Sequence, residues 1–171
     1  MTAVLVTGMS GTGKSTALAE LARRGHRVVD TDYDDWTEDV PLADNAGSER
    51  LWREDRMDAL LDGHSGGVLF ISGCVANQVK FYPRFAVIVL LSAPMDVLLD
   101  RLASRGTNDY GKTDAQRALI VHDVRTIEPL LRAGATAEID TRKPVAEVVA
   151  FLESIAGLSE TSAAAVTPPG P

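Results

Sequence analysis

The segment from Gly8 to Ser15, Gly-Met-Ser-Gly-Thr-Gly-Lys-Ser, constrains this chain more than any other part of its sequence. It matches the pattern G-x-x-x-x-G-K-[ST]. The run before it, Ala3–Thr7, is apolar and typical of a buried strand, and Ser15–Arg24 after it has the apolar spacing of a helix. Glycines here let consecutive backbone N–H groups point inward, and the helix N-terminus adds a partial positive charge. The sequence therefore predicts a cradle for the phosphates of a nucleoside triphosphate.

Strand and helix patterns alternate along the rest of the chain. Strands are expected at Arg27–Asp32, Val68–Ile71, Phe85–Leu91 and Ala135–Asp140, of which Val68–Ile71 and Phe85–Leu91 have the pattern of burial on both faces. Helices are expected at Glu49–Leu61, Asp96–Ser104, Asp114–Leu131 and Val145–Ile155. The segment Tyr33–Ser48 is expected to be irregular. Because this alternation implies right-handed parallel crossovers, the predicted fold class is α/β, a three-layer α/β/α P-loop NTPase with a five-stranded parallel sheet. Ligands of such folds bind at the carboxyl ends of the strands.

The length of 171 residues and the hydrophobic content of 45% suit a single globular domain. We expect residues 1–157 to form it, with the polar loop at about residues 106–113 as a lid. Residues 158–171 have little to bury and contain three prolines, so we expect a disordered tail.

Composition also limits the partners of the chain. No apolar run approaches the roughly 18 residues of a membrane-spanning helix. No basic segment precedes the first apolar stretch, so we expect a cytoplasmic protein without membrane contact. A net charge of −7 argues against a nucleic-acid partner, which needs a basic face.

Each side chain of the glycine-rich motif has an expected role in binding ATP and Mg²⁺. Lys14 is expected to neutralise the transferring phosphoryl group, and the Ser15 hydroxyl to ligate Mg²⁺. Thr16 would add a hydroxyl to the α-phosphate. The cradle itself is expected to consist of Gly8, Met9, Ser10, Gly11, Thr12 and Gly13.

Two acids at the end of the second predicted strand suggest phosphoryl transfer. Strand alternation places Asp30 and Asp32 on the same side. One carboxylate would hold a Mg²⁺-bound water and the other would accept the proton of an attacking hydroxyl. The alternative is a pair of solvated acids at a strand end. A motor ATPase usually has an acid after a core strand, whereas Val68–Ile71 is followed by Ser-Gly-Cys, and no guanine-reading Asn-Lys-x-Asp stretch is present.

With these motifs the chain resembles the small P-loop kinases of the nucleoside-monophosphate-kinase-like fold, and most closely the shikimate kinase and adenylate kinase group. The resemblance implies that Asp30 serves Mg²⁺ and that Asp32 contacts the acceptor hydroxyl. It implies that Arg101 packs on adenine and Arg105 reaches the phosphates, so the expected catalytic residues are Lys14, Asp32 and Arg105. The implied adenine-binding loop contains Thr141, Arg142 and Pro144.

The sequence departs from shikimate kinases where the acceptor would bind. Ser72-Gly73-Cys74 stands in place of a glycine triplet, and Ile127 stands where an arginine is expected before the Pro-Leu element. We therefore expect an acceptor other than shikimate: another small hydroxyl compound, or a nucleotide.

Further acceptor contacts are expected from three places. Gly73 keeps the central glycine of the triplet. Arg53 and Arg56 share a helix face, where the resembled family holds an anionic group, although a solvated helix face is an equal alternative. Asn77 and Gln78 follow the third predicted strand, where small kinases contact the acceptor.

The sequence thus predicts an ATP-dependent small-molecule kinase that phosphorylates a hydroxyl of a small polar acceptor. The alternatives are a nucleoside or nucleotide kinase, a polynucleotide 5′-kinase, and a nucleotide-binding regulatory switch. Either a monomer or a homodimer is compatible with the sequence.

Overall fold

The computed structural model describes residues 2–43, 47–104 and 113–157. The predicted tail, 158–171, and the predicted lid apart from Thr113 lie outside these residues. The elements, in chain order, are β1 (Thr2–Thr7), α1 (Lys14–Arg23), β2 (Arg27–Asp30), β3 (Thr37–Pro41), β4 (Ser48–Trp52), α2 (Glu54–Asp62), β5 (Val68–Ser72), the 3₁₀ helix η1 (Ala76–Arg84), β6 (Val87–Ser92), α3 (Met95–Ser104), α4 (Asp114–Thr126), α5 (Glu128–Gly134), β7 (Ala137–Asp140) and α6 (Val145–Ile155).

Five parallel strands form the central sheet in the order β2-β5-β1-β6-β7. The first strand lies in the middle, where Val4 pairs with Phe70 of β5 and Val6 with Val89 of β6. All four of these side chains are fully buried, which explains why their sequences are continuously apolar. The predicted five-stranded parallel sheet is confirmed.

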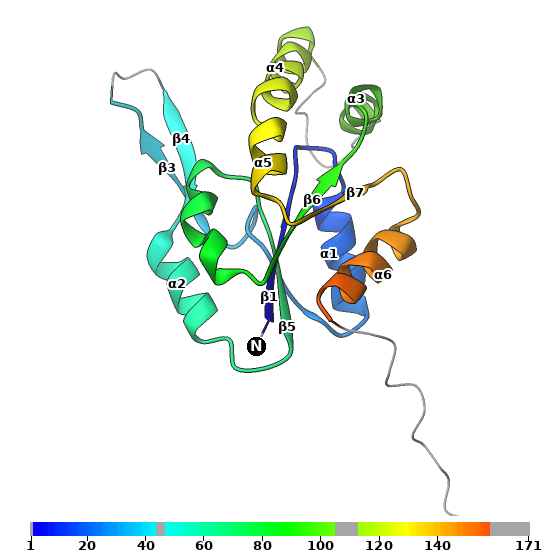
Figure 1. Cartoon of the computed structure of the whole chain (residues 1–171). Helices are drawn as coiled ribbons and strands as arrows, with labels where there is room; N and C mark the ends of the chain where they lie inside the picture. Colours follow the sequence, from blue (N-terminus) through cyan, green and yellow to red (C-terminus); the bar gives the residue numbers. More distant parts are fainter. Residues whose placement is uncertain (1, 44–46, 105–112, 158–171) are drawn as a thin grey trace, which may run out of the picture.

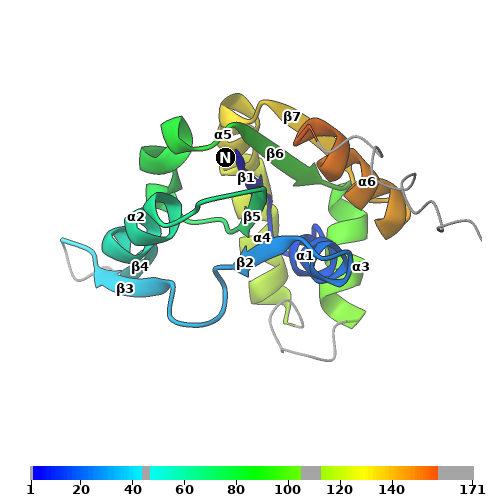
Figure 2. The ribbon, with the colours of Figure 1, turned by 90° about the horizontal axis from the view of Figure 1, so that it is seen from below.

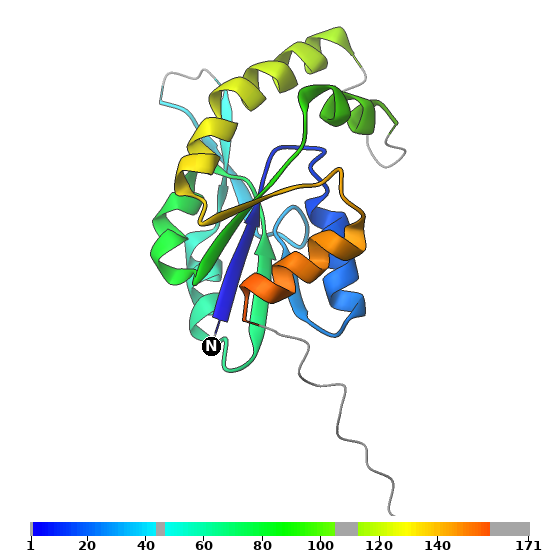
Figure 3. The same ribbon diagram turned by 45° about the vertical axis from the view of Figure 1, so that its right-hand side comes forward.

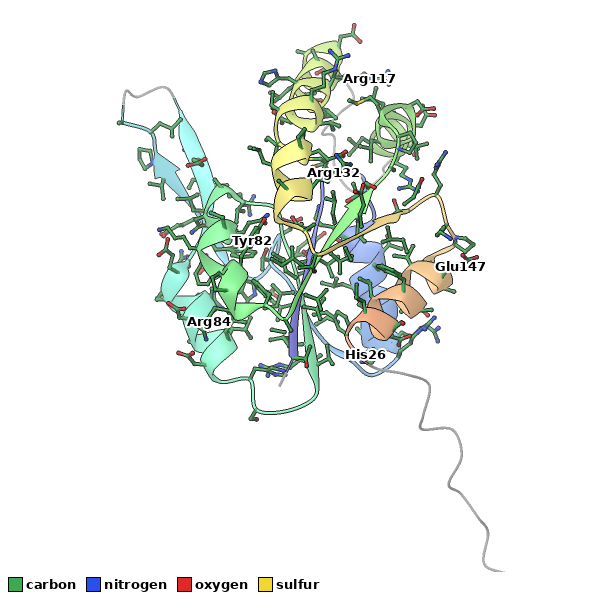
Figure 4. All side chains as sticks on the ribbon, in the orientation of Figure 1. His26, Tyr82, Arg84, Arg117, Arg132 and Glu147 are labelled. Atoms are coloured by element: carbon green, nitrogen blue, oxygen red, sulfur yellow. The ribbon has the colours of Figure 1, made fainter. Side chains whose placement is uncertain are left out.

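Helices cover both faces of this sheet (Figures 1 and 2). On one face α1 and α6 pack through Leu21 and Leu152 against β1, β5 and β6. On the other face, α2 and η1 pack through Met57 and Phe81. Arg84 of η1 also forms ion pairs with Asp58 and Asp62 of α2, and Figure 4 shows it on the side of η1 nearest α2. The predicted three-layer architecture is therefore confirmed.

A two-stranded hairpin, β3–β4, occupies most of the segment expected to be irregular (Figure 1). Thr37 pairs with Trp52 and Asp39 with Arg50, so residues expected to begin a helix form a strand instead. The helix α2 begins only at Glu54. The reason is Trp52, which is 1% exposed and anchors the end of β4 in the core. The polar residues before Trp52 do not show the apolar alternation typical of a strand. The sequence alone therefore favours a helix here.

Two other boundaries differ from the prediction. The expected helix 114–131 divides at Ile127, because Pro129 in the first turn of α5 has no N–H with which to continue the helix α4. The strand β2 ends at Asp30, and Thr31 and Asp32 lie in a turn. Strand alternation therefore does not fix the direction of Asp32, and that step of the sequence argument was wrong.

The helices that the structure describes are all too short or too polar to cross a membrane.

Candidate active site

The glycine-rich loop leads from β1 into α1 at the carboxyl edge of the sheet, and Figure 3 shows this edge from the side. Gly8 has a φ of 150°, and a Cβ atom there would lie 2.4 Å from the Leu91 carbonyl oxygen, so only glycine fits. Gly13 precedes the helix with a φ of 91° and caps it without a side-chain hydrogen bond. The first N–H groups of α1 are therefore available to an anion, as a phosphate cradle requires.

Lys14 is folded back onto the loop and is only 8% exposed. Its Nζ donates hydrogen bonds to the carbonyl oxygens of Gly8, at 2.7 Å, and Met9, at 3.3 Å. The Thr12 hydroxyl donates to the same Met9 oxygen at 2.8 Å. A buried ammonium group beside open N–H groups is well suited to phosphate oxygens, which could replace the two carbonyl partners of Lys14.

A cavity of about 480 Å³ adjoins the loop. Its walls include six residues predicted to bind ATP: Gly11, Thr12, Gly13, Thr16, Arg101 and Thr141. Lys143, Val145 and Val148, which also line the cavity, belong to the stretch that resembles an adenine-binding loop. No signal in the sequence points to the two remaining walls, Ala17 and Ser104. A polar floor with an apolar α6 wall suits a nucleotide with its base against α6.

Arg142 and Pro144 do not line this cavity. Arg142 instead forms an ion pair with Asp140, and this contact lowers the pKa of the Asp140 carboxyl below its ordinary value. Of the three residues predicted for the adenine loop, Thr141 lines the cavity, and nucleotide binding by Arg142 and Pro144 stays a prediction.

Arg101 joins the phosphate loop to the predicted adenine loop. Its guanidinium donates to the Gly11 carbonyl oxygen at 3.2 Å, to the Thr141 hydroxyl at 2.9 Å and to the Thr141 carbonyl oxygen at 2.6 Å. Thr141 in turn donates from its N–H to the Ser92 carbonyl oxygen at 2.8 Å. Arg101 therefore fixes the distance between two walls of the cavity. Arg105, its predicted partner, lies outside the described residues.

The acid pair lies at the same edge, after β2. Asp30 accepts hydrogen bonds from the Ser72 hydroxyl at 3.0 Å and from the Asp32 N–H at 3.2 Å. Asp32 is exposed, and so is Ser15 in the first turn of α1. Among the residues described, no group of three or more His, Cys, Asp and Glu side chains converges as a metal site. Mg²⁺ would therefore be held by Ser15 and Asp30 only together with phosphate oxygens.

The pKa of the Cys74 thiol responds to charges on both the phosphate loop and the acid pair. Burial raises the pKa of its thiol, the positive charge of Lys14 and a hydrogen bond with Thr7 oppose this shift, and the negative charge of Asp32 adds to it. In the sheet, β5 lies between β1 and β2, so the loop that carries Lys14 and the segment that carries Asp32 leave the same carboxyl edge on either side of the strand that Cys74 follows.

Arg53 and Arg56 turn toward the segment that follows the acid pair. Arg53 lies 3.1 Å from an Asp35 carboxylate oxygen. Arg56 donates to the carbonyl oxygens of Asp34, at 3.0 Å, and Asp35, at 2.7 Å, and stacks over the Trp36 ring at 4.6 Å. Both aspartates have a positive φ, 56° and 61°, which Asp tolerates better than most residues. The hydrogen bonds from Arg56 to their carbonyl oxygens help to hold this backbone conformation.

The other predicted acceptor residues are engaged inside the fold. Asn77 accepts from the Trp52 N–H and donates to the Trp52 carbonyl oxygen, both at 2.9 Å. Gln78 donates to the Tyr82 hydroxyl at 3.0 Å, and Figure 4 shows Tyr82 on η1. A Cβ atom on Gly73 would lie 2.4 Å from the Thr31 hydroxyl and 2.8 Å from the Trp52 ring. These contacts explain the residue types, and acceptor binding by these residues stays a prediction.

Comparison with known proteins gives a family and a fold. The family model described as an AAA domain matches residues 4–122. Comparison with curated proteins gives no significant sequence match.

Three solved structures illustrate the fold. The shikimate kinase from Acinetobacter baumannii, in complex with shikimate, is 19% identical with a TM-score of 0.62, covering 92% of this chain and 94% of that one. The shikimate kinase from Bacteroides thetaiotaomicron is 19% identical with a TM-score of 0.65, covering 92% and 99%. A sugar kinase from Janibacter sp. HTCC2649 is 17% identical with a TM-score of 0.57, covering 93% and 96%. The predicted nucleoside-monophosphate-kinase-like P-loop fold is confirmed.

Proposed function

The chain belongs to the AAA domain family, and on that premise we propose that it transfers the γ-phosphoryl group of ATP to a hydroxyl of a small polar acceptor other than shikimate. The observation that carries the proposal is that a lysine and a carboxylate both lie at the carboxyl edge of the sheet. The phosphate loop supplies the buried ammonium of Lys14, and the end of β2 supplies the exposed carboxylate of Asp32. Only β5 separates the strand before the phosphate loop, β1, from β2 in the sheet. A cation for phosphate beside a base for a hydroxyl is what phosphoryl transfer needs.

The proposed roles follow from the contacts of each residue. The open N–H groups at the start of α1 would bind phosphate oxygens, and Lys14 would exchange its two carbonyl partners for them. Bound Mg²⁺, held by Ser15 and Asp30, would neutralise charge on the phosphates. Asp32 would orient the acceptor hydroxyl and accept its proton as the acceptor oxygen bonds to the γ-phosphorus. The bond from that phosphorus to the β,γ-bridging oxygen breaks in the same transfer, and ADP leaves. Arg105 is proposed to stabilise charge on the transferring group.

The nature of the acceptor is proposed from the charges around Asp32. Arg53 and Arg56 already contact Asp35 and the neighbouring carbonyl oxygens, so they are poorly placed to clamp a carboxylate. Ile127 stands where the resembled shikimate kinases have an arginine. Both facts favour an uncharged hydroxyl compound, and the likeness to a sugar kinase fold is consistent with this.

The test is ATP consumption with polyols, sugars, nucleosides, nucleoside monophosphates and hydroxylated antibiotics, followed by Asp32→Asn on the best acceptor. Loss of the base should lower kcat by about 10²-fold or more, while ATP affinity changes little. Asp39→Asn is the matched control, since Asp39 lies on the exposed hairpin, and it should keep wild-type turnover.

Two results would point elsewhere. Full turnover by Asp32→Asn on a nucleoside monophosphate would indicate a nucleotide kinase, whose phosphate acceptor needs no base. Phosphorylation of no acceptor, together with hydrolysis that depends on a protein partner, would indicate a regulatory switch.

A further inference from the structure

Thr31, the residue between the two acids, is fully buried although it is polar and lies beyond the end of β2. Its N–H donates to the Ser72 carbonyl oxygen at 3.0 Å, and its hydroxyl donates to the same oxygen at 2.7 Å. This hydroxyl also accepts a hydrogen bond from the Trp52 indole Nε1–H at 2.8 Å. Thr31 therefore extends the pairing of β2 with β5 by one residue and uses its side chain as well as its backbone.

Trp52 is itself held on several sides. Its backbone N–H and carbonyl oxygen are both paired with the Asn77 side-chain amide, and its ring meets Phe81 edge-on at 5.8 Å between centroids. The indole covers Gly73, where a Cβ atom would come within 2.8 Å of the ring. These contacts hold the indole ring in one orientation, in which its N–H is directed at the Thr31 hydroxyl.

The acid pair depends on this arrangement. Asp30 and Asp32 are the two neighbours of Thr31, and Asp30 accepts from the Asp32 N–H at 3.2 Å. Asp30 also accepts from the hydroxyl of Ser72, the residue that Thr31 holds through its carbonyl oxygen. Because the backbone of Thr31 is fixed, the backbone positions from which the Asp30 and Asp32 side chains extend are restricted as well. The pairing of β2 with β5 also holds Asp30, which lies opposite Ser72, whereas Asp32 lies in a turn and beyond that pairing.

We propose that Trp52 and Thr31 act as a positioning pair that sets the direction of Asp32 for proton acceptance from the acceptor hydroxyl. The inference rests on the proposed function for its effect on turnover, and on the hydrogen bonds alone for its effect on order. A misplacement of about 1 Å at a catalytic group can cost about 10²-fold in rate. Loss of the indole–hydroxyl bond should therefore be visible in kcat.

The experiment compares Thr31→Val and Trp52→Phe, singly and together. Valine keeps the volume of threonine without the hydroxyl, and phenylalanine keeps a ring against Phe81 without the N–H. Each variant should lower kcat about tenfold or more, with the ATP dissociation constant within about twofold of wild type. Because the two residues act through one hydrogen bond, the double variant should lose little more than the worse single variant. Thr31→Ser, which keeps the hydroxyl, should recover most of the rate.

Thr37→Val is the matched control. Thr37 also accepts a hydrogen bond, from Arg50 at 2.8 Å, but it does so on the hairpin, away from the acids. Its kcat should stay within about twofold of wild type. Unchanged kcat in both Thr31→Val and Trp52→Phe would overturn the proposal, and so would additive losses in the double variant.

A second measurement does not depend on turnover. Amide hydrogen exchange at Thr31 should become about tenfold faster in Thr31→Val and Trp52→Phe, while the Ala17 amide, bonded to the Gly13 carbonyl oxygen in α1, keeps its rate. Equal acceleration at both amides would mean general destabilisation and would overturn the positioning role, as would no change at residue 31. If the wild-type protein phosphorylates no acceptor, the proposed function fails, and the exchange rates still decide whether the pair orders the acid segment.

Discussion

The nucleotide side and the acceptor side of the sheet edge are built in different ways. The side proposed to bind the nucleotide consists mainly of one continuous segment, Gly8–Ser15, which ends at the uncapped first turn of α1. On the acceptor side, the segment after β2 is held by side chains from three distant elements, namely Trp52 of β4, Arg56 of α2 and Ser72 of β5. One side presents its polar groups outward, whereas the other uses most of its polar groups to hold itself together.

This difference separates two uses of polar residues near a site. Among the described residues, Lys14 donates to two loop carbonyl oxygens, which phosphate oxygens can replace. Asn77 is paired with both backbone groups of Trp52, and substitution would take its amide away from a buried N–H and a buried carbonyl oxygen. Substitution of Lys14 should therefore affect ligand affinity and turnover, whereas substitution of an interior amide such as Asn77 should mainly affect folding stability.

The largest expected effect is that of Lys14→Ala. Removing a charged donor to the transferring phosphoryl group should lower kcat/KM by about 10²–10³-fold. The free energy of unfolding should change little, because the lysine is bonded to a loop rather than to the core. The measurement is ATP-dependent turnover beside a thermal melt, with Lys80→Ala, on η1, as the control. A large fall in Tm would contradict the proposed division between the two sides.

A smaller effect, and one of a different kind, is expected for Asn77→Leu. Leucine has a similar volume but leaves the buried N–H and carbonyl oxygen of Trp52 without partners, which should lower the free energy of unfolding by about 2–4 kcal/mol. Urea denaturation measures this, and ATP affinity should be retained. If stability is unchanged and the KM for the acceptor rises, Asn77 is an acceptor contact, as its place in the sequence predicted.

The smallest expected effect is that of Arg101→Met. The variant loses the hydrogen bonds from the guanidinium to Gly11 and Thr141, so the walls of the cavity are no longer tied together. ATP affinity, measured by calorimetry, should fall about tenfold, the equivalent of one charged hydrogen bond. Arg142→Met should change the affinity less, because Arg142 pairs with Asp140 outside the cavity. Equal losses of ATP affinity in the two variants would indicate that Arg142 also binds the nucleotide, as the sequence predicted.

The fold around the glycine-rich loop could be predicted from the sequence because its signals are local. The pattern Gly8–Ser15 is contiguous, and its strand and helix are its immediate neighbours. The apolar runs of β1, β5 and β6 likewise indicate buried parallel strands without knowledge of their partners. The cavity walls on α6 follow from the same helical periodicity.

The acceptor side could not be predicted in the same way, because its contacts join residues far apart in the chain. Thr31 and Trp52 are 21 positions apart, and Trp52 and Asn77 are 25 apart. Nothing near Trp52 in the sequence shows that its indole has an acceptor, and Ser48–Trp52 contains too many exposed polar residues to be recognised as a strand. Only the pairing with Thr37–Pro41 makes it one.

The β3–β4 hairpin forms a sheet of its own and shares no hydrogen-bonded strand pair with the five-stranded sheet. It is attached to the body of the domain mainly at its base, through Trp52, and its two ends are joined by the hydrogen bond from the Arg53 N–H to the Trp36 carbonyl oxygen. In mechanical terms the hairpin is an appendage of the domain. Its exposed side chains, Glu38 and Asp39 among them, can change without breaking a hydrogen bond of the central ladder.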